Sequence, residues 1–423
     1  MAQDYGGSPQ VMIRVPVAAA AATAQVIVAG TASNMSATAT QFQFVHGGGD
    51  QAWGATFNVR EATVPSAGVI DDFHAEIQAA PGSGNRYRFT LFLNGSATAV
   101  ACDITHPDLG CTDTTGDTSF SVSANDEIAL QVDPNSVPAT RRSRWAFDFT
   151  PTTADDYWIL GDAGQTGTTE TERFFGLMGA QSTVETVQTQ RQQPVCEAGV
   201  IGPLHVRMST AVINTTTVTY EIEKDTGSGF ASFSPAISCV IDSDATAPGD
   251  IECSDADTGM VNAGDLLSIT QVATGTLLNN AVNWSLGWDP TTAGRFMMMG
   301  SNDDALNTSG TTEEKIILVT ADGQMNPAAS TIAMSTTRSM TVHNIYTVIN
   351  TAPGSGNSWV FKLRSVGATT FDPNCAIENT ATACNDTDSL TVSDDDDLSF
   401  QTDPNNSAPD ANSGTGWCVS ASK

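Results

Sequence analysis

The sequence contains three copies of one unit. Residues 80–85 read Ala-Pro-Gly-Ser-Gly-Asn, and residues 352–357 read the same six residues, 272 positions later. The segment Pro-Thr-Thr-Ala occurs at 151–154 and again at 290–293. One tryptophan marks the tail of each copy, and these are Trp145, Trp284 and Trp417. The spacings agree on a unit of about 136 residues, and a repeat of this kind determines the whole architecture.

We place the unit boundaries near residues 40, 152 and 292. This division gives an N-terminal arm and three repeats, with the ranges 1–40, 41–152, 153–292 and 293–423. The arm either docks onto a neighbour or stays unstructured. The second repeat diverges most, because Asn214-Thr-Thr stands near the place of the Gly-rich turn. It still keeps Ala198-Gly-Val-Ile, which matches Ala67-Gly-Val-Ile in the first repeat.

Each unit shows the alternation of a half-buried β-strand. Apolar side chains occupy every second position at Tyr87, Phe89 and Leu91 in the first repeat. The third repeat has the equivalent run at Trp359, Phe361 and Leu363. About eight such strands separated by turn residues fit one unit, which is typical of a sandwich. The sequence therefore predicts an all-β protein of three tandem antiparallel β-sandwich (jelly-roll) domains.

Charge excludes two classes of partner. Lys and Arg total 17 against 47 Asp and Glu, so the formal net charge is −30. Such a surface repels phosphate backbones and anionic lipid surfaces, and we expect no nucleic acid and no membrane as a partner. The apolar stretch at 18–30 is too short to span a bilayer, and no basic cluster precedes it. We therefore expect neither a membrane segment nor a cleaved secretory signal.

Six of the eight cysteines form one close pair in each repeat. These candidate disulfide residues are Cys102, Cys111, Cys239, Cys253, Cys375 and Cys384. A crosslink at this place would staple a hairpin, and the spacing is too wide for zinc ligands. Disulfides indicate an oxidising destination outside the cytoplasm, either extracellular or on a virion surface. Cys196 and Cys418 have no counterparts; they pair across repeats, join subunits or remain free.

An acidic run is the candidate metal site. Asp394, Asp395 and Asp396 could hold calcium, which binds carboxylate oxygens, although the spaced ligand pattern of a calcium loop is absent. The alternative is a turn in which the last Asp of the run, Asp397, binds backbone amides. Apart from this calcium candidate, we expect no cofactor.

The titratable residues show no catalytic arrangement. His74 and His205 align between repeats, and Tyr346 stands at the same place in the third. A position shared by His and Tyr is typical of an amphipathic strand. Catalytic triads and phosphate-binding loops are absent from the pattern, so we expect no enzyme and no catalytic residue.

The repeats resemble a known class of module. Residues 122–132 read Val-Ser-Ala-Asn-Asp-Glu-Ile-Ala-Leu-Gln-Val, and residues 261–269 read Val-Asn-Ala-Gly-Asp-Leu-Leu-Ser-Ile. Both are similar to the Gly-Asp strand of complement and tumour-necrosis-factor-like jelly rolls. The fuller pattern resembles repeats of phage virion and bacterial surface proteins. The resemblance implies trimerising, ligand-presenting modules, and it marks a fold and not an activity.

Two functions follow as expectations. The first is a non-enzymatic structural protein of a virus particle, such as a phage head decoration protein, a fibre or a tail-associated adhesin. The alternative is a secreted bacterial adhesin or filament subunit that binds glycans. Expected partners are other virion or surface proteins, a host glycan and further copies in a homo-oligomer, or else one chain forms a pseudo-trimer alone. Trp53, Tyr157, Trp158 and Phe174 are either a glycan platform or core residues.

Overall fold

The computed structural model confirms the all-β class, with several antiparallel sheets and two short 3-10 helices in its described part. The described residues are 23–31, 33–47, 52–113, 118–164, 172–181, 185–212, 216–242, 251–275, 277, 281–306, 314–316, 318–319, 334–335, 339–365, 373–393, 396–405 and 413–423. Among these residues, no helix is long and apolar enough to cross a membrane.

The first unit has two sheets that face each other. Its inner sheet contains β1 (Gln25–Gly30), β10 (Ser143–Pro151), β4 (Gly68–Ile77), β7 (Gly110–Thr112) and β8 (Phe120–Val122). Its outer sheet contains β2 (Gln41–Gln43), β9 (Glu127–Asn135), β5 (Arg86–Leu93), β6 (Ser96–Thr105) and β3 (Ala62–Thr63). The helix η1 (Phe57–Val59) precedes β3.

The second unit repeats this order with one extra strand in each sheet. Its inner sheet contains β13 (Gly179–Gln181), β11 (Tyr157–Ala163), β22 (Val282–Pro290), β15 (Gly199–Met208), β19 (Glu252–Asp255) and β20 (Gly259–Val261). Its outer sheet contains β12 (Arg173–Phe175), β21 (Leu266–Thr274), β16 (Thr217–Asp225), β17 (Phe230–Ser232), β18 (Ser238–Asp242) and β14 (Gln193–Pro194). The helix η2 (Gln188–Gln190) corresponds to η1, and β13 runs parallel to β11.

The third unit has the same two sheets. Its inner sheet contains β23 (Phe296–Ala305), β32 (Ser413–Ser422), β26 (Met340–Ile349), β29 (Ala383–Asp386) and β30 (Leu390–Val392). Its outer sheet contains β24 (Glu314–Ile316), β31 (Asp397–Asn405), β27 (Gly354–Ser365), β28 (Asn374–Asn379) and β25 (Met334–Ser335).

The first unit begins earlier than the sequence suggests. β1 lies inside the range 1–40, yet it pairs along its whole length with β10 of the first inner sheet. The boundary at residue 40 is therefore wrong for residues 25–30. The strand QVIVAG is short and buried throughout, so it lacks the polar–apolar alternation of a half-exposed strand.

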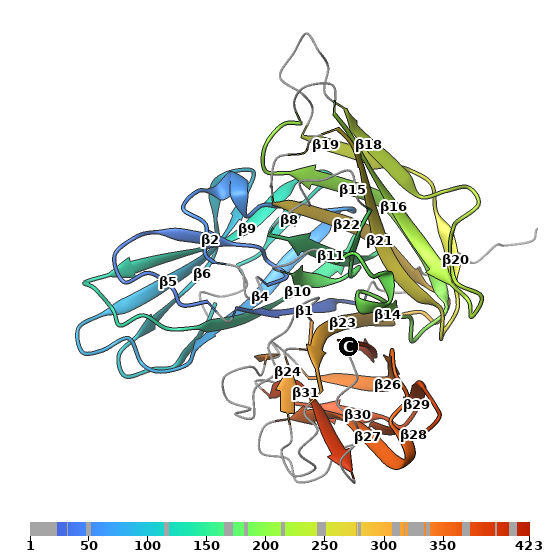
Figure 1. Cartoon of the computed structure of the whole chain (residues 1–423). Coiled ribbons are helices and arrows are strands. Elements are labelled where there is room, and N and C mark those ends of the chain that lie inside the picture. The colour runs from blue at the N-terminus through green and yellow to red at the C-terminus, as the bar shows by residue number, and fades with distance from the viewer. Residues whose placement is uncertain are drawn as a thin grey trace, which may run out of the picture.

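The three tandem units form a closed ring. β3 of the first unit contacts β15 and β22 of the second, and β14 contacts β23, β26 and β32 of the third. β25 of the third unit in turn contacts β1, β4 and β10 of the first. These are equivalent strands on equivalent sheets. The chain therefore contains a pseudo-trimer, and β1, β11 and β23 gather near its centre (Figure 1).

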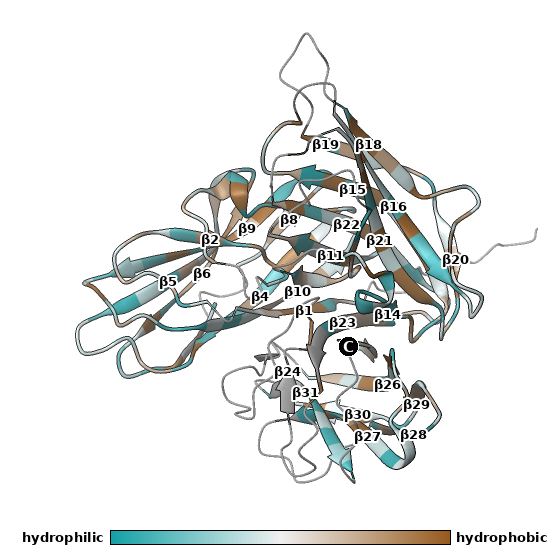
Figure 2. Cartoon of the chain, viewed as in Figure 1, coloured by the Kyte–Doolittle hydropathy of each residue, from teal (hydrophilic) through white to brown (hydrophobic). Residues whose placement is uncertain are grey.

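One buried apolar cluster runs through all three units. The bands of hydrophobic and hydrophilic colour along β15 and β16 show the alternation that the sequence predicts (Figure 2). β10 differs, since both of its faces are covered and even Ala146 and Asp148 are 0% exposed. One face of β10 packs inside its own sandwich and the other is covered by a neighbouring unit. The inner sheets therefore form the core of the ring.

The recurring tryptophans hold equivalent places in this core. Trp145, Trp284 and Trp417 each donate an indole N–H to a backbone carbonyl of their own unit, at 2.8, 2.8 and 2.7 Å. Gly161 and Gly300 lie opposite the second and third indoles, where a β-carbon would overlap the ring. These glycines are needed for close approach, and a buried Trp N–H needs such a partner.

Candidate binding clefts between the units

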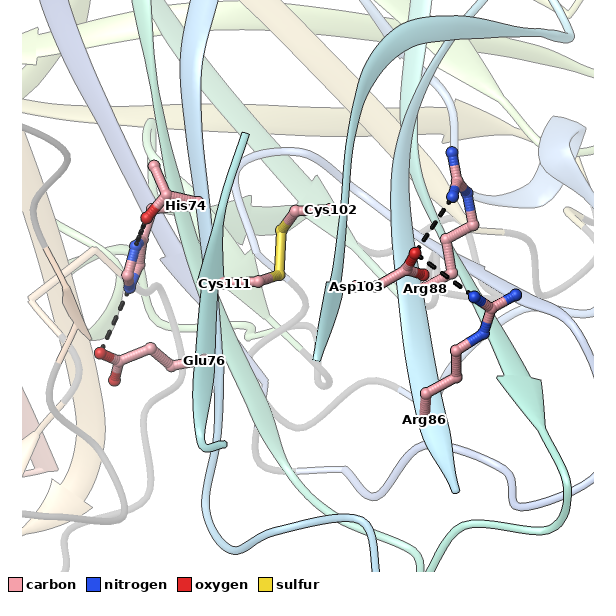
Figure 3. The surroundings of a disulfide bond; sticks show 8 residues. His74, Glu76, Arg86, Arg88, Cys102, Asp103 and Cys111 are labelled. Carbon is pink, nitrogen blue, oxygen red and sulfur yellow. Dashed lines mark hydrogen bonds and ion pairs between the residues drawn. A yellow bond between two sulfur atoms is a disulfide. The ribbon is translucent and has the colours of Figure 1, made fainter. Parts of the chain in front are cut away.

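The three predicted cysteine pairs are disulfides, Cys102–Cys111, Cys239–Cys253 and Cys375–Cys384. Their role differs from the expected hairpin staple. In each unit one cysteine lies on the outer sheet and the other on the inner sheet, as between β6 and β7. The bond therefore ties the two layers of a sandwich together. Figure 3 shows the first pair between the His74–Glu76 side and the Arg86–Arg88–Asp103 side.

The fourth disulfide joins two units. Cys196 lies just before β15 in the second unit, and Cys418 lies on β32 in the third. Both side chains are buried, at 4% and 0% exposure. Sequence left three possibilities open for these residues, and the structure selects pairing across repeats. Agreement between repeats could not predict this pair, because no equivalent cysteines exist at the other two contacts of the ring.

The acidic run behaves as a turn where it is described. Asp396 accepts a hydrogen bond from the amide of Ser393 at 2.8 Å. In the other two units, Asp126 accepts from the amide three residues before it at 2.7 Å, and Asp265 does so from its own third preceding residue at 2.9 Å. The equivalent residue is thus Asp396 and not Asp397, a shift of one position. Asp394 and Asp395 lie outside the described residues, and the calcium proposal stays untested.

The aromatic residues considered for a glycan platform belong to the core. Trp53 and Phe174 are each 7% exposed, Trp158 is 1% exposed and Tyr157 is 0% exposed. Trp158 stacks on Phe149 of the first unit, and its backbone N–H and C=O bond the side-chain amide of Gln25 at 2.8 Å. Of the two interpretations, the core one is correct.

The third contact of the ring carries an acidic cluster. Asp71, Asp72 and Asp148 bring one carboxylate oxygen each within 4.8 Å of one another. Lys423 of the third unit forms an ion pair with the buried Asp148. The cluster therefore contributes to the contact between the third and first units.

An ionic cluster joins the first unit to the second. Arg207 on β15 contacts Glu61 of the first unit at 2.6 Å and Glu127 at 2.7 Å. It also contacts Glu252 of its own unit at 2.8 Å. Three carboxylates around one guanidinium leave excess negative charge. Burial raises the pKa of Glu61 to about 7, Arg207 opposes this effect, and Glu127 adds to it.

A cleft of about 430 Å³ lies beside this cluster, and its lining includes Asn125, Glu127, His205, Arg207 and Glu252. Its walls are mostly charged or polar. Burial lowers the pKa of His205, with Glu252 acting in the opposite direction, and the net effect favours the neutral imidazole. The cleft is thus a polar groove between two units.

A second cleft lies at the equivalent place between the second and third units. Its volume is about 390 Å³, and its lining includes Gly264, Leu266, Tyr346, Val348 and Ala383. Val348 pairs with Ala383 across β26 and β29, as Arg207 pairs with Glu252 across β15 and β19. Two contacts of the ring therefore have a cleft at the same position, and the two clefts are lined by chemically different residues. Tyr346, interpreted from sequence as a strand residue, is part of the lining of the second cleft.

The ionic cluster predicts a pH effect that Glu61→Gln should remove. A carboxyl with a raised pKa binds its proton more tightly when folded, so its contribution to stability falls as pH rises from about 4.5 through 7. We expect wild type to lose about 2 kcal/mol of unfolding free energy relative to Glu61→Gln between pH 5 and pH 8, because the folded carboxyl releases its proton within this pH range whereas the unfolded carboxyl has mostly released it by pH 5. Urea unfolding at several pH values measures this difference.

Glu252→Gln is the matched control. It removes a carboxylate from the same guanidinium, but that side chain is 65% exposed. We expect a change below about 1 kcal/mol that is flat with pH. A Glu61→Gln difference that is equally flat would contradict the buried-carboxyl account.

Comparisons with known proteins give no family. No protein-family model matches the chain, and no curated protein matches it. A solved capsid structure, the human norovirus GI.7 Houston strain virus-like particle, aligns over 90% of this chain and 94% of its own. The identity is 9% and the TM-score is 0.16. A score this low establishes no shared fold, so we base the functional inference on the geometry of the ring.

Proposed function

We propose that this chain is a non-enzymatic structural protein of a virus particle, in the role of a head decoration protein, fibre or tail-associated adhesin. The observation that carries the proposal is the closed ring of three equivalent sandwiches in one chain. Such a ring presents three similar faces about one axis, which suits a threefold or pseudo-threefold position in a symmetric assembly. The sequence resemblance to trimerising virion and surface modules supports the same role.

The disulfide bonds favour a location outside the cell. Four disulfides tie sheets and units together, and such bonds persist in oxidising surroundings. The net charge of −30 keeps the protein soluble and opposes non-specific association. We therefore place the protein on a virion surface or in the extracellular medium, with other surface proteins as partners.

Particle composition tests this proposal. Virions purified by density gradient from a culture that produces the chain are digested and analysed by mass spectrometry. We expect its peptides to band with the particles and to remain after a high-salt wash. Peptides found only in the soluble medium, together with an N-terminus processed by signal cleavage, would favour the secreted adhesin and contradict the particle role.

A further inference from the structure

We propose that the cleft between the second and third units binds a neutral saccharide. This inference deepens the proposed surface role and rests on it for its biological meaning, while the binding itself is a property of the purified chain. The volume of about 390 Å³ lies within the range of ~300–1,000 Å³ that small-molecule sites occupy.

The apolar part of the cleft lining comes from both units. Leu266 extends from the second unit, and Tyr346 and Val348 extend from the third. Tyr346 is half-buried, and its hydroxyl faces Gly264, where an added β-carbon would lie 3.3 Å from the oxygen. An aromatic ring beside aliphatic side chains is the surface on which the apolar face of a pyranose packs.

The rim carries hydrogen-bonding groups. Asp225 Oδ1 accepts from the amides of three successive residues at 2.6, 2.9 and 2.9 Å, which fixes this carboxylate in place. We expect its Oδ2 to accept from ligand hydroxyls. Gln192 donates from Nε2 to Asn350 Oδ1 at 3.1 Å, so two amide side chains from different units are joined at the same rim. A lining with both an apolar part and fixed hydrogen-bonding groups matches a ring that has one apolar face and several hydroxyls.

The charge of the lining selects among saccharides. Asp225 is the charged residue among those that line this cleft, and the whole chain is strongly acidic. A sialic acid or a uronic acid would meet repulsion there, whereas a neutral hexose would not. The equivalent cleft between the first and second units has charged walls and has His205 in place of Tyr346, so we do not expect it to bind the same ligand.

The disulfide between the units holds the cleft in shape. Tyr346 pairs across the inner sheet with Cys418, and Cys418 is bonded to Cys196 of the second unit. The two walls are thus linked covalently next to the aromatic residue. A site fixed before binding loses less conformational freedom when the ligand arrives, which favours affinity.

Ligand-observed NMR on the full-length protein tests the inference. The panel contains glucose, galactose, mannose, N-acetylglucosamine and lactose, with N-acetylneuraminic acid as the anionic comparison, each at about 10 mM, where a dissociation constant near 1 mM is detectable. We expect saturation transfer to at least one neutral sugar and weaker transfer to the anionic one. Transfer to none of the neutral sugars, or stronger transfer to N-acetylneuraminic acid, would overturn the proposal.

Three variants locate the binding. Tyr346→Ala is expected to lower the affinity for the sugar about tenfold or more. Thr382→Trp, at an exposed position of the lining, is expected to block the cleft without disturbing the core. His205→Ala changes the equivalent position of the other cleft and is expected to leave binding unchanged. Binding that survives Thr382→Trp in a protein of unchanged melting temperature would place the sugar elsewhere.

The two proposals fail separately. Sugar binding in this cleft by a chain that is absent from purified virions would reject the particle role and keep the saccharide site. A chain found in virions that binds no neutral sugar would keep the particle role and reject the site.

Discussion

Replacing Trp284 with alanine is expected to lower the free energy of unfolding by about 4 kcal/mol. The side chain is 1% exposed and packs against Phe175, with ring centroids 5.4 Å apart. Its loss leaves a cavity and an unpaired carbonyl at Leu177, and large-to-small changes of this kind cost about 3–5 kcal/mol. Equilibrium unfolding in guanidinium, followed by tryptophan fluorescence and circular dichroism, measures the change.

Trp284→Phe separates the two contributions. It keeps one six-membered ring but removes the N–H donor and the rest of the indole, so we expect a loss of about 2–3 kcal/mol, smaller than that of Trp284→Ala. If Trp284→Ala costs no more than Trp284→Phe, the indole is not the packed centre of the second unit. That outcome would also weaken the equivalence of the three recurring tryptophans.

Removing the disulfide between the units is the second large effect. Cys196 and Cys418 are 222 residues apart, whereas Cys375 and Cys384 are 9 apart. By the chain-entropy estimate the long loop contributes about 5 kcal/mol and the short loop about 2.5–3 kcal/mol. We therefore expect the Cys196→Ala/Cys418→Ala double variant to be less stable than the Cys375→Ala/Cys384→Ala double variant.

Urea unfolding of both double variants, without reductant, gives the comparison. The two differ in what they connect as well as in loop length, since one joins units and the other joins sheets within a unit. Equal losses, or a smaller loss for the bond between units, would contradict the idea that this bond holds the second and third units together.

Much of the fold within a unit was predictable from sequence. The alternation at Tyr87, Phe89 and Leu91 predicts strands whose apolar side chains are buried, and these residues are 0–1% exposed. The repeat extends this reasoning to the third unit, where Trp359, Phe361 and Leu363 are each 0% exposed. The close cysteine pairs follow from the same repeat. Local periodicity and copy-to-copy agreement contain this information.

Contacts between units were harder to predict from the sequence. β1 was assigned to an arm because a short, fully buried strand has no alternation, and its burial comes from neighbours far along the chain. Pairing of Cys196 with Cys418 depends on the ring and on nothing local. The same holds for Arg207 and Tyr346, whose clefts exist only where two units meet. A useful signal was present: positions equivalent between repeats, yet occupied by chemically different residues, lie at these contacts.

One chain supplies the three sandwiches of a complete ring. Because β25 closes the ring against the first unit, the contacts that a homotrimer of single modules would use are already filled within the chain. Native mass, measured by light scattering on the purified oxidised protein, tests this directly. We predict a particle of 44.1 kDa. A particle of about three times that mass, persisting on dilution at physiological salt, would contradict the single-chain pseudo-trimer.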